Sequence, residues 1–149
     1  MREKTIINIS LAPQPVGPYS QGIKFGDIIF LSGQLPVDPG TNKIIGEDIT
    51  IQTRQCLDNI KSILEPAGSS LFNILKTTVF LTNMDDFGAM NKVYAQYFSH
   101  EPPARSCVQV ARLPLNAKIE IEITAYIPKP QDSGLGLFGP KDKSGPGLY

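Results

Sequence analysis

The residues most suited to take part in a reaction lie in two segments near the C-terminal end, 105–111 and 118–127. Polar and apolar side chains alternate in both. This alternation predicts two β-strands, because successive side chains of a strand point to opposite faces of a sheet. If the apolar residues of both strands join one core, the polar residues must share the other face. The residues expected together on that face are Arg105, Cys107, Glu120 and Glu122.

An arginine and a glutamate on one face suggest a specific chemistry. The planar guanidinium of Arg105 stays charged and matches a carboxylate through two parallel hydrogen bonds. A carboxyl group whose pKa is tuned by partial burial, Glu120 or Glu122 here, can accept a proton from water. Together they suit a small carboxylate substrate in which water attacks the neighbouring electrophilic carbon. The alternative is a solvated sheet face on which these charges form only cross-strand pairs.

The elements that must position these strands follow from the spacing of apolar residues. One apolar stripe at helical spacing predicts a helix over 48–65, and a second predicts a helix that begins near Asn83 or Asp85 and ends before Pro102. Further strands are expected at 5–9, 23–25, 28–31 and 74–81, with a loop over 36–46. This order predicts an α+β fold with a single mixed sheet and two helices packed on one face.

The strand expected at 28–31 is a continuous apolar run, which is typical of a strand buried on both faces. The sheet face without helices is therefore expected to be partly apolar. Such a face favours association with another chain.

The composition changes after residue 127, which predicts a domain over 1–127 and a tail over 128–149. Nine of the 22 residues of the tail are Gly or Pro, which is typical of a flexible segment, although an arm that docks on a neighbouring subunit is an alternative. The GxGxxG pattern at 134–139 is not interpreted as a dinucleotide site, because no helix and no second parallel strand follow it.

Charge and residue counts argue against several functions. Fourteen basic and fourteen acidic residues give no cationic footprint for nucleic acid and no support for a membrane surface. His100 is the sole histidine, so neither a catalytic triad nor a His-rich metal site is expected. Two cysteines without metal-ligand spacing, and no signal peptide or membrane span, favour a cytoplasmic protein without a metal.

Several motifs, in order, resemble those of one family. They are Pro103-Ala104-Arg105-Ser106-Cys107-Val108-Gln109-Val110-Ala111-Arg112-Leu113-Pro114 with Lys118-Ile119-Glu120-Ile121-Glu122, then Gly17-Pro18-Tyr19-Ser20-Gln21-Gly22, Ser32-Gly33-Gln34-Leu35-Pro36-Val37-Asp38-Pro39 and Lys76-Thr77-Thr78-Val79-Phe80-Leu81. In one register over about 6–127, the chain is similar to the Rid family (RidA/YjgF-like).

The resemblance implies a chorismate-mutase-like fold of the YjgF type and a homotrimer with three interface clefts. It also implies hydrolysis of 2-aminoacrylate and of 2-iminopropanoate or 2-iminobutanoate to 2-keto acids and ammonia, without a cofactor. By the same resemblance Arg105 would bind the substrate carboxylate, Glu120 would orient or deprotonate water, and the backbone N–H of Cys107 would line the pocket. The resemblance further implies substrate contacts across the subunit boundary from Tyr19, Ser32, Gly33 and Asn91.

Three other functions are compatible with parts of this pattern. A trimeric sensor of small carboxylates would need Arg105 but not Glu120. An RNA-directed role, as a translation inhibitor or an endoribonuclease, is linked to some relatives. The zero net charge of this chain argues against such a role here. A chorismate mutase would need several cations in one cleft, and among the arginines only Arg105 is well placed.

Overall fold

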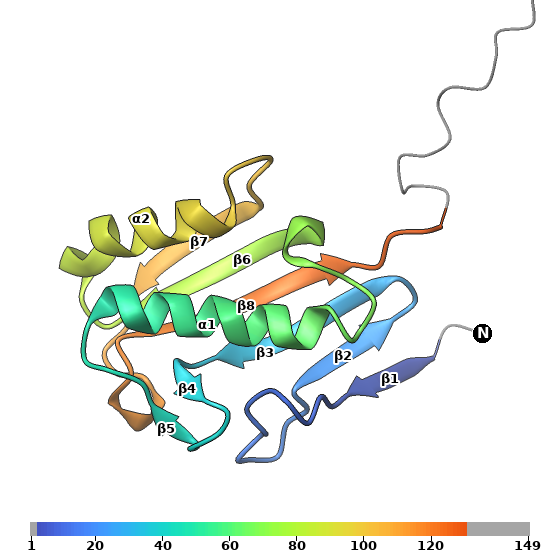
Figure 1. The fold of residues 1–149 in the computed structure, drawn as a ribbon, viewed down its shortest axis with the longest axis horizontal. Helices are drawn as coiled ribbons and strands as arrows, with labels where there is room; N and C mark the ends of the chain where they lie inside the picture. The colour runs from blue at the N-terminus through green and yellow to red at the C-terminus, as the bar shows by residue number, and fades with distance from the viewer. Residues whose placement is uncertain (1–2, 131–149) are drawn as a thin grey trace, which may run out of the picture.

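The structure is a computed structural model that describes residues 3–130. Its main feature is a six-stranded sheet in the order β1-β2-β3-β8-β6-β7 (Figure 1). The strands are β1 (Lys4–Ile7), β2 (Gly22–Phe25), β3 (Ile28–Gln34), β6 (Ile74–Leu81), β7 (Ala104–Gln109) and β8 (Ile119–Tyr126). Only β6 and β7 pair in parallel, so the sheet is mixed, as predicted.

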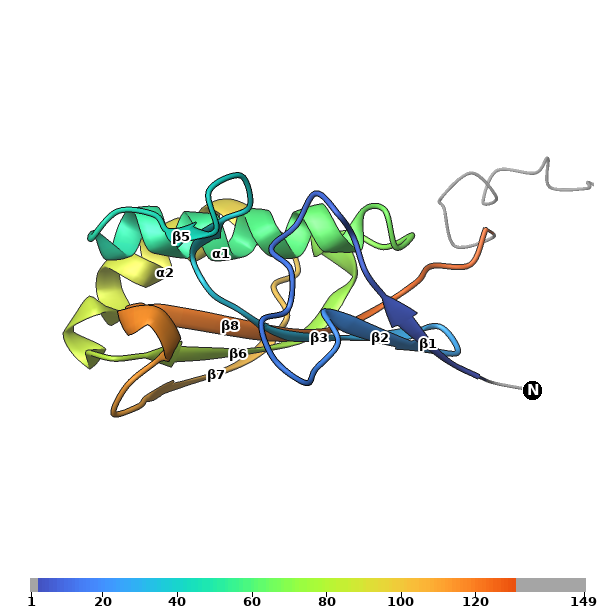
Figure 2. The same cartoon turned by 90° about the horizontal axis from the view of Figure 1, so that it is seen from below.

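Both helices, α1 (Ile49–Leu64) and α2 (Phe87–Tyr97), cover the same face of the sheet and leave the other open (Figure 2). The predicted α+β architecture is therefore confirmed. Asp48 begins α1, because its Oδ1 accepts hydrogen bonds from the backbone N–H groups of Thr50 (2.7 Å) and Ile51 (3.4 Å). Short 3-10 turns, η1 (Leu71–Asn73), η2 (Met84–Asp86) and η3 (Pro114–Asn116), connect the larger elements.

The core lies between the helices and the sheet. Leu57 and Ile60 of α1 are fully buried against the strands. The sheet residues buried with them include Ile29, Val79, Leu81, Ile119 and Ile121. These residues come from β3, β6, β8 and α1, and Met90 and Tyr94 of α2 join the same cluster. One apolar cluster therefore fixes these three strands and both helices relative to one another.

Residues 36–46, which we expected to form a loop, contain a small two-stranded ribbon of β4 (Val37–Asp38) and β5 (Lys43–Ile44). A buried amide holds it against α1. The Asn59 Nδ2 donates hydrogen bonds to the carbonyl oxygens of Leu35 (3.1 Å) and Val37 (2.9 Å). Short strands that contribute so few apolar residues leave no periodic signal in the sequence.

The open face of the sheet is partly apolar, as the run at 28–31 predicted. Phe30 on β3 is 49% exposed and Val108 on β7 is 43% exposed. Ile29 and Leu31 instead face the helices and are buried. Within residues 3–130, no helix combines the length and apolarity that a membrane crossing requires. The predicted tail lies mostly outside the described residues, and the GxGxxG pattern lies wholly outside them.

Candidate active site

One part of our prediction is wrong: Arg105 and Glu120 do not share a face of the sheet. On β6, Thr77 is the register partner of both Arg105 and Ile123, which puts Arg105 on the helix-covered face with the buried isoleucines of β8. Phe80 lies three residues after Thr77 on β6, so its side chain points to the opposite face of the sheet. Phe80 is the register partner of Glu120, so Glu120 points to the open face. The chain therefore carries two separate groups of candidate residues.

The first group surrounds Arg105 and is called the arginine patch; it comprises Arg105, Cys107, Asn91, Phe87 and Tyr94. The Nη1 of Arg105 donates a hydrogen bond of 2.8 Å to Oδ1 of Asn91. The guanidinium carbon lies 4.6 Å from the ring centre of Tyr94 and 5.6 Å from that of Phe87. Because aromatic faces attract cations, α2 holds the half-buried guanidinium in place without neutralising it.

Within residues 3–130, no carboxylate forms an ion pair with Arg105. In the part of the chain from residue 3 to residue 130, the one ion pair joins Lys61 to Glu65 on α1. A partly buried guanidinium with an amide partner and spare N–H groups is suited to bind an anion. A planar carboxylate is the anion whose geometry matches it best.

A hydrogen bond to strand β6 holds Tyr94 in place. Its hydroxyl and Oγ1 of Thr77 form a buried hydrogen bond of 2.8 Å. Burial raises the pKa of Tyr94, against opposing effects of the Thr77 hydrogen bond and the Arg105 charge. The phenol therefore stays protonated near neutral pH. The contacts from Thr77 to Tyr94 and from Tyr94 to Arg105 fix the guanidinium relative to the sheet.

Cys107 lies two residues beyond Arg105 on the same strand face and is half-buried. Burial raises the pKa of its thiol, and the positive charge of Arg105 offsets this only in part. A thiol with a raised pKa is mostly protonated at neutral pH and is a poor nucleophile. The side chain therefore fits the role of a pocket wall better than that of a covalent catalyst.

The second group is called the glutamate patch and comprises Glu120, Gly33, Ser32 and Tyr19. Burial and, to a lesser degree, the negative charge of Glu122 raise the pKa of Glu120. Its carboxyl lies directly over Gly33, where an added Cβ would overlap with Oε1. The register of β3 against β8 shifts between Leu31 and Gln34, so this contact lies at an irregularity of the ladder.

Ser32 of β3 and Tyr19 of the N-terminal loop complete the glutamate patch. The Ser32 Oγ donates to the carbonyl of Ser20 at 2.6 Å, and the Ser32 backbone N–H donates to the carbonyl of Gln21 at 3.0 Å. The hydroxyl of Tyr19 accepts a hydrogen bond from the backbone N–H of Val16 at 3.3 Å. The two Ser32 bonds tie the loop to β3, and the Tyr19 bond lies within the loop.

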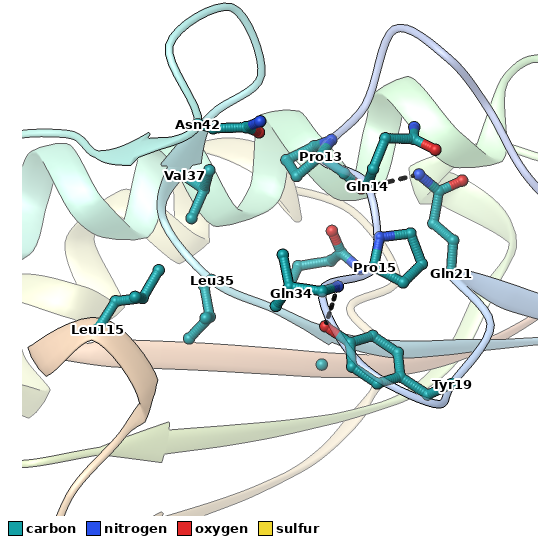
Figure 3. Close-up of a pocket in the computed structure, with 12 residues that line it drawn as sticks. Pro13, Gln14, Pro15, Tyr19, Gln21, Gln34, Leu35, Val37, Asn42 and Leu115 are labelled. Carbon is teal, nitrogen blue, oxygen red and sulfur yellow. Dashed lines mark hydrogen bonds between the residues drawn. The ribbon is translucent and has the colours of Figure 1, made fainter.

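A cavity of about 140 Å³ opens beside the glutamate patch (Figure 3). Tyr19 and Gly33 belong to both the patch and the cavity. The remaining wall comes from the N-terminal loop, the segment around β4 and the tip of η3. Glu120 itself does not line the cavity, and Gly33, which its carboxyl covers, connects the two.

The seven residues predicted for the site fall into these two groups, three on the arginine patch and four on the glutamate patch. Sequence reasoning did not identify Phe87, Tyr94 and Thr77 as partners of Arg105. Phe87 and Tyr94 lie on the apolar stripe that predicts the second helix, and only the strand register reveals that they face an arginine.

Comparisons with known proteins agree with this fold and these motifs. The sequence model of the family described as Endoribonuclease L-PSP matches residues 9–127. The chain is 54% identical over 123 residues to a RutC family protein of Pyrococcus horikoshii, covering 83% of this chain and 98% of that protein. It is 48% identical over 117 residues to the 2-iminobutanoate/2-iminopropanoate deaminase of Salmonella typhimurium, covering 76% and 91% of the two chains.

Solved structures give the same result. The crystal structure of E. coli TdcF with bound serine superposes with a TM-score of 0.77 at 47% identity and covers 82% of this chain and 98% of that one. The crystal structure of yeast Mmf1 superposes with a TM-score of 0.80 at 42% identity, covering 83% and 98%. From the motifs, the fold and these matches together, the chain belongs to the endoribonuclease L-PSP family, the family of YjgF and the Rid proteins.

Proposed function

We propose that the protein hydrolyses reactive 2-imino acids and their enamine tautomers, such as 2-aminoacrylate, to 2-keto acids and ammonia. The observation that carries this proposal is the half-buried guanidinium of Arg105, which two aromatic rings and Asn91 hold while no carboxylate of the described residues pairs with it. The name of the 48% identical Salmonella relative supports the substrate class.

Since Arg105 and Glu120 lie on opposite faces, we propose that the active site is completed between copies of the chain in a homotrimer. The arginine patch lies on β7, an edge strand, where a second copy can approach. The partly apolar open face, with Phe30 and Val108, supports burial against such a copy. One copy would then supply Arg105 and its neighbour would supply Glu120.

The proposed reaction begins with the iminium form of the substrate. Arg105 binds its carboxylate, and the backbone N–H of Cys107 contacts the same group. The Glu120 carboxylate takes a proton from water while the water oxygen bonds to the iminium carbon, which gives a carbinolamine. Glu120 then protonates the nitrogen, the C–N bond breaks as the C=O bond forms, and the hydroxyl proton leaves with ammonia as ammonium. An enamine first takes up a proton from solvent on its terminal carbon, which gives the same iminium.

The environment of Glu120 supports its role as the base. A carboxyl whose pKa is raised by burial is a stronger base than an exposed one and lies closer to the working pH. Positioning and general-base catalysis together suffice, because base catalysis alone contributes about 10²–10⁴-fold. A cytoplasmic location, expected for a chain whose two cysteines are unpaired, is part of this proposal.

The test generates 2-aminoacrylate in place from serine with a serine dehydratase and follows pyruvate formation. Wild type should accelerate the conversion, and Arg105→Ala should not. Arg54→Ala, which removes an exposed arginine of α1, is the matched control and should behave as wild type. If wild type binds small 2-keto acids but does not accelerate the conversion, a carboxylate sensor replaces the enzyme.

A further inference from the structure

We propose that the cavity beside Gly33 receives the side chain of the substrate and that it selects 2-imino acids with medium-sized apolar side chains, of the size of leucine or phenylalanine. This inference rests on the proposed function and extends it to a substrate class. It starts from the position of the cavity: Gly33 contacts the carboxyl of Glu120 and also forms part of the cavity wall. A substrate carbon attacked by water at Glu120 therefore lies next to the cavity.

The wall of the cavity is mostly apolar (Figure 3). Its apolar members are Pro13, Pro15, Val16, Leu35, Val37 and Leu115. An acidic or basic side chain would lose hydration here and would find no opposite charge, because the polar lining residues Gln14, Gln21, Gln34 and Asn42 are neutral. An aliphatic or phenyl group would gain from the transfer. The chemistry of the wall thus favours apolar side chains.

The volume sets the size of the group. At about 140 Å³ the cavity is far larger than a methyl group needs. An apolar cavity of about 150 Å³ in another protein binds benzene. The smallest imino acids, with a methyl or ethyl group, would leave most of the space unfilled, while an isobutyl or benzyl group would fill it.

Two buried amides fix the wall before any ligand arrives. Asn59 on α1 holds the carbonyls of Leu35 and Val37, as described above. On the other side, the Nε2 of Gln21 donates to the carbonyl of Pro13 at 3.0 Å. A pocket whose walls are held in this way is pre-formed, which is typical of ligand sites.

Leu115 provides an independent indication. Its backbone is in the left-handed region (φ 57, ψ 22), which disfavours a bulky residue, and its side chain is 62% exposed. Asparagine or glycine would fit this backbone better; Asn42, which also lines the cavity at φ 59, is an example. Leucine at this position gains little from contacts within its own chain. A bound apolar side chain would give it a partner.

The experiment compares imines formed in place from L-alanine and L-leucine by an L-amino acid oxidase. Wild type should act on both, with a higher kcat/KM for the leucine-derived imine. Leu115→Asn, which suits the left-handed backbone, should lower kcat/KM about tenfold for the leucine-derived imine and much less for the alanine-derived one, because a few methylene contacts are worth factors of this size. Leu11→Asn makes the same change at a 78% exposed leucine outside the cavity and should alter neither rate.

Calorimetric titration with the two products, pyruvate and the leucine-derived 2-keto acid, separates this inference from the proposed function. Tighter binding of the larger acid, lost in Leu115→Asn, supports the pocket even if no hydrolysis occurs. Hydrolysis of the alanine-derived imine with no preference in rate or binding for the larger group would overturn the pocket and leave the deaminase proposal intact. An equal loss on both substrates in Leu115→Asn would also overturn it.

Discussion

Arg105 and Glu120 point to opposite faces of one sheet, since Arg105 is aligned with Ile123 through Thr77 of β6, whereas Glu120 is aligned with Phe80. The guanidinium lies under α2 and the carboxyl lies over Gly33. A single chain with this arrangement cannot bring both groups to one small substrate. If both act in one reaction, the missing half of each site must come from another copy.

The rings beneath Arg105 predict a graded response at Tyr94. Tyr94→Phe keeps the ring and loses only the hydrogen bond to Thr77, so it should weaken binding of pyruvate less than twofold. Tyr94→Leu removes the ring face and should weaken binding about threefold to tenfold, the range expected for a partly buried cation–π contact. Titration calorimetry measures both, with thermal unfolding as the control for folding. Equal effects of the two variants would contradict a role for the ring.

The raised pKa of Glu120 predicts a pH dependence. Activity requires the ionised carboxylate, so kcat/KM should fall as the pH drops through a value above the ordinary 4.5 of glutamate. Glu122→Gln removes the like charge and should lower the pKa of Glu120, which moves the acid limb to lower pH. A pH–rate profile of both proteins measures the shift. An acid limb that moves upward in the variant would contradict the assignment.

The same pKa predicts an effect on stability. A carboxyl with a folded-state pKa above its unfolded value favours the folded state when protonated, so its contribution to stability is lost as the pH rises through the folded-state pKa. Glu120→Gln should therefore stabilise the protein at pH 7, by no more than about 1 kcal/mol because solvent screens a half-buried group. Denaturant unfolding at pH 7 and pH 4 measures this gain, which should shrink at the lower pH. A loss of stability at pH 7 would argue that Glu120 is paired in the folded protein.

Close contact with Glu120 predicts that Gly33 tolerates no side chain. Gly33→Ala should displace the carboxyl, lower kcat about 100-fold and destabilise the fold by about 1–3 kcal/mol, as overpacking does. Gly88 on α2 offers the matched control, because an added Cβ there would meet nothing within 4 Å. Gly88→Ala should raise stability by about 0.5–1 kcal/mol and leave kcat unchanged. Normal activity in Gly33→Ala would remove Glu120 from the mechanism.

A protonated Cys107 predicts that its thiol is dispensable. Cys107→Ala keeps the backbone N–H and should retain at least a third of wild-type kcat/KM. This corresponds to a loss of no more than about 0.6 kcal/mol of transition-state binding. The reaction with iodoacetamide at pH 7 should be slow, because the thiolate fraction is small. Loss of activity in Cys107→Ala, with normal folding, would point to covalent catalysis instead.

The sequence predicts the fold well because apolar periodicity reports burial directly. The stripes of α1 and α2 and the alternation in β8 all reflect side chains that are buried in the structure. The face of β7 was predicted wrongly, because its valine side looked like the core side. On this edge strand Arg105 and Cys107 instead cover the core while Val108 is exposed.

Contacts between distant segments account for the parts of the site that the sequence could not reveal. Alternation places Glu120 and Glu122 on one face but does not distinguish them. The distinction comes from Gly33, which lies more than eighty residues earlier in the chain and leaves space for only one of the two carboxyls. The pairing of Arg105 with Tyr94 depends in the same way on the crossing of α2 over β7.

The most direct test of a site shared between copies is complementation between two inactive variants. Arg105→Ala and Glu120→Gln would each be prepared, mixed in equal amounts and allowed to exchange subunits, with the exchange followed by mass spectrometry of tagged chains. In a random mixture of trimers about one quarter of the interfaces join an intact Arg105 to an intact Glu120, so about one quarter of wild-type deaminase activity should return. A mixture of Arg105→Ala with the double variant is the control and should stay inactive. If exchange is complete and the first mixture also stays inactive, Arg105 and Glu120 do not act together across an interface, and the proposed mechanism is wrong.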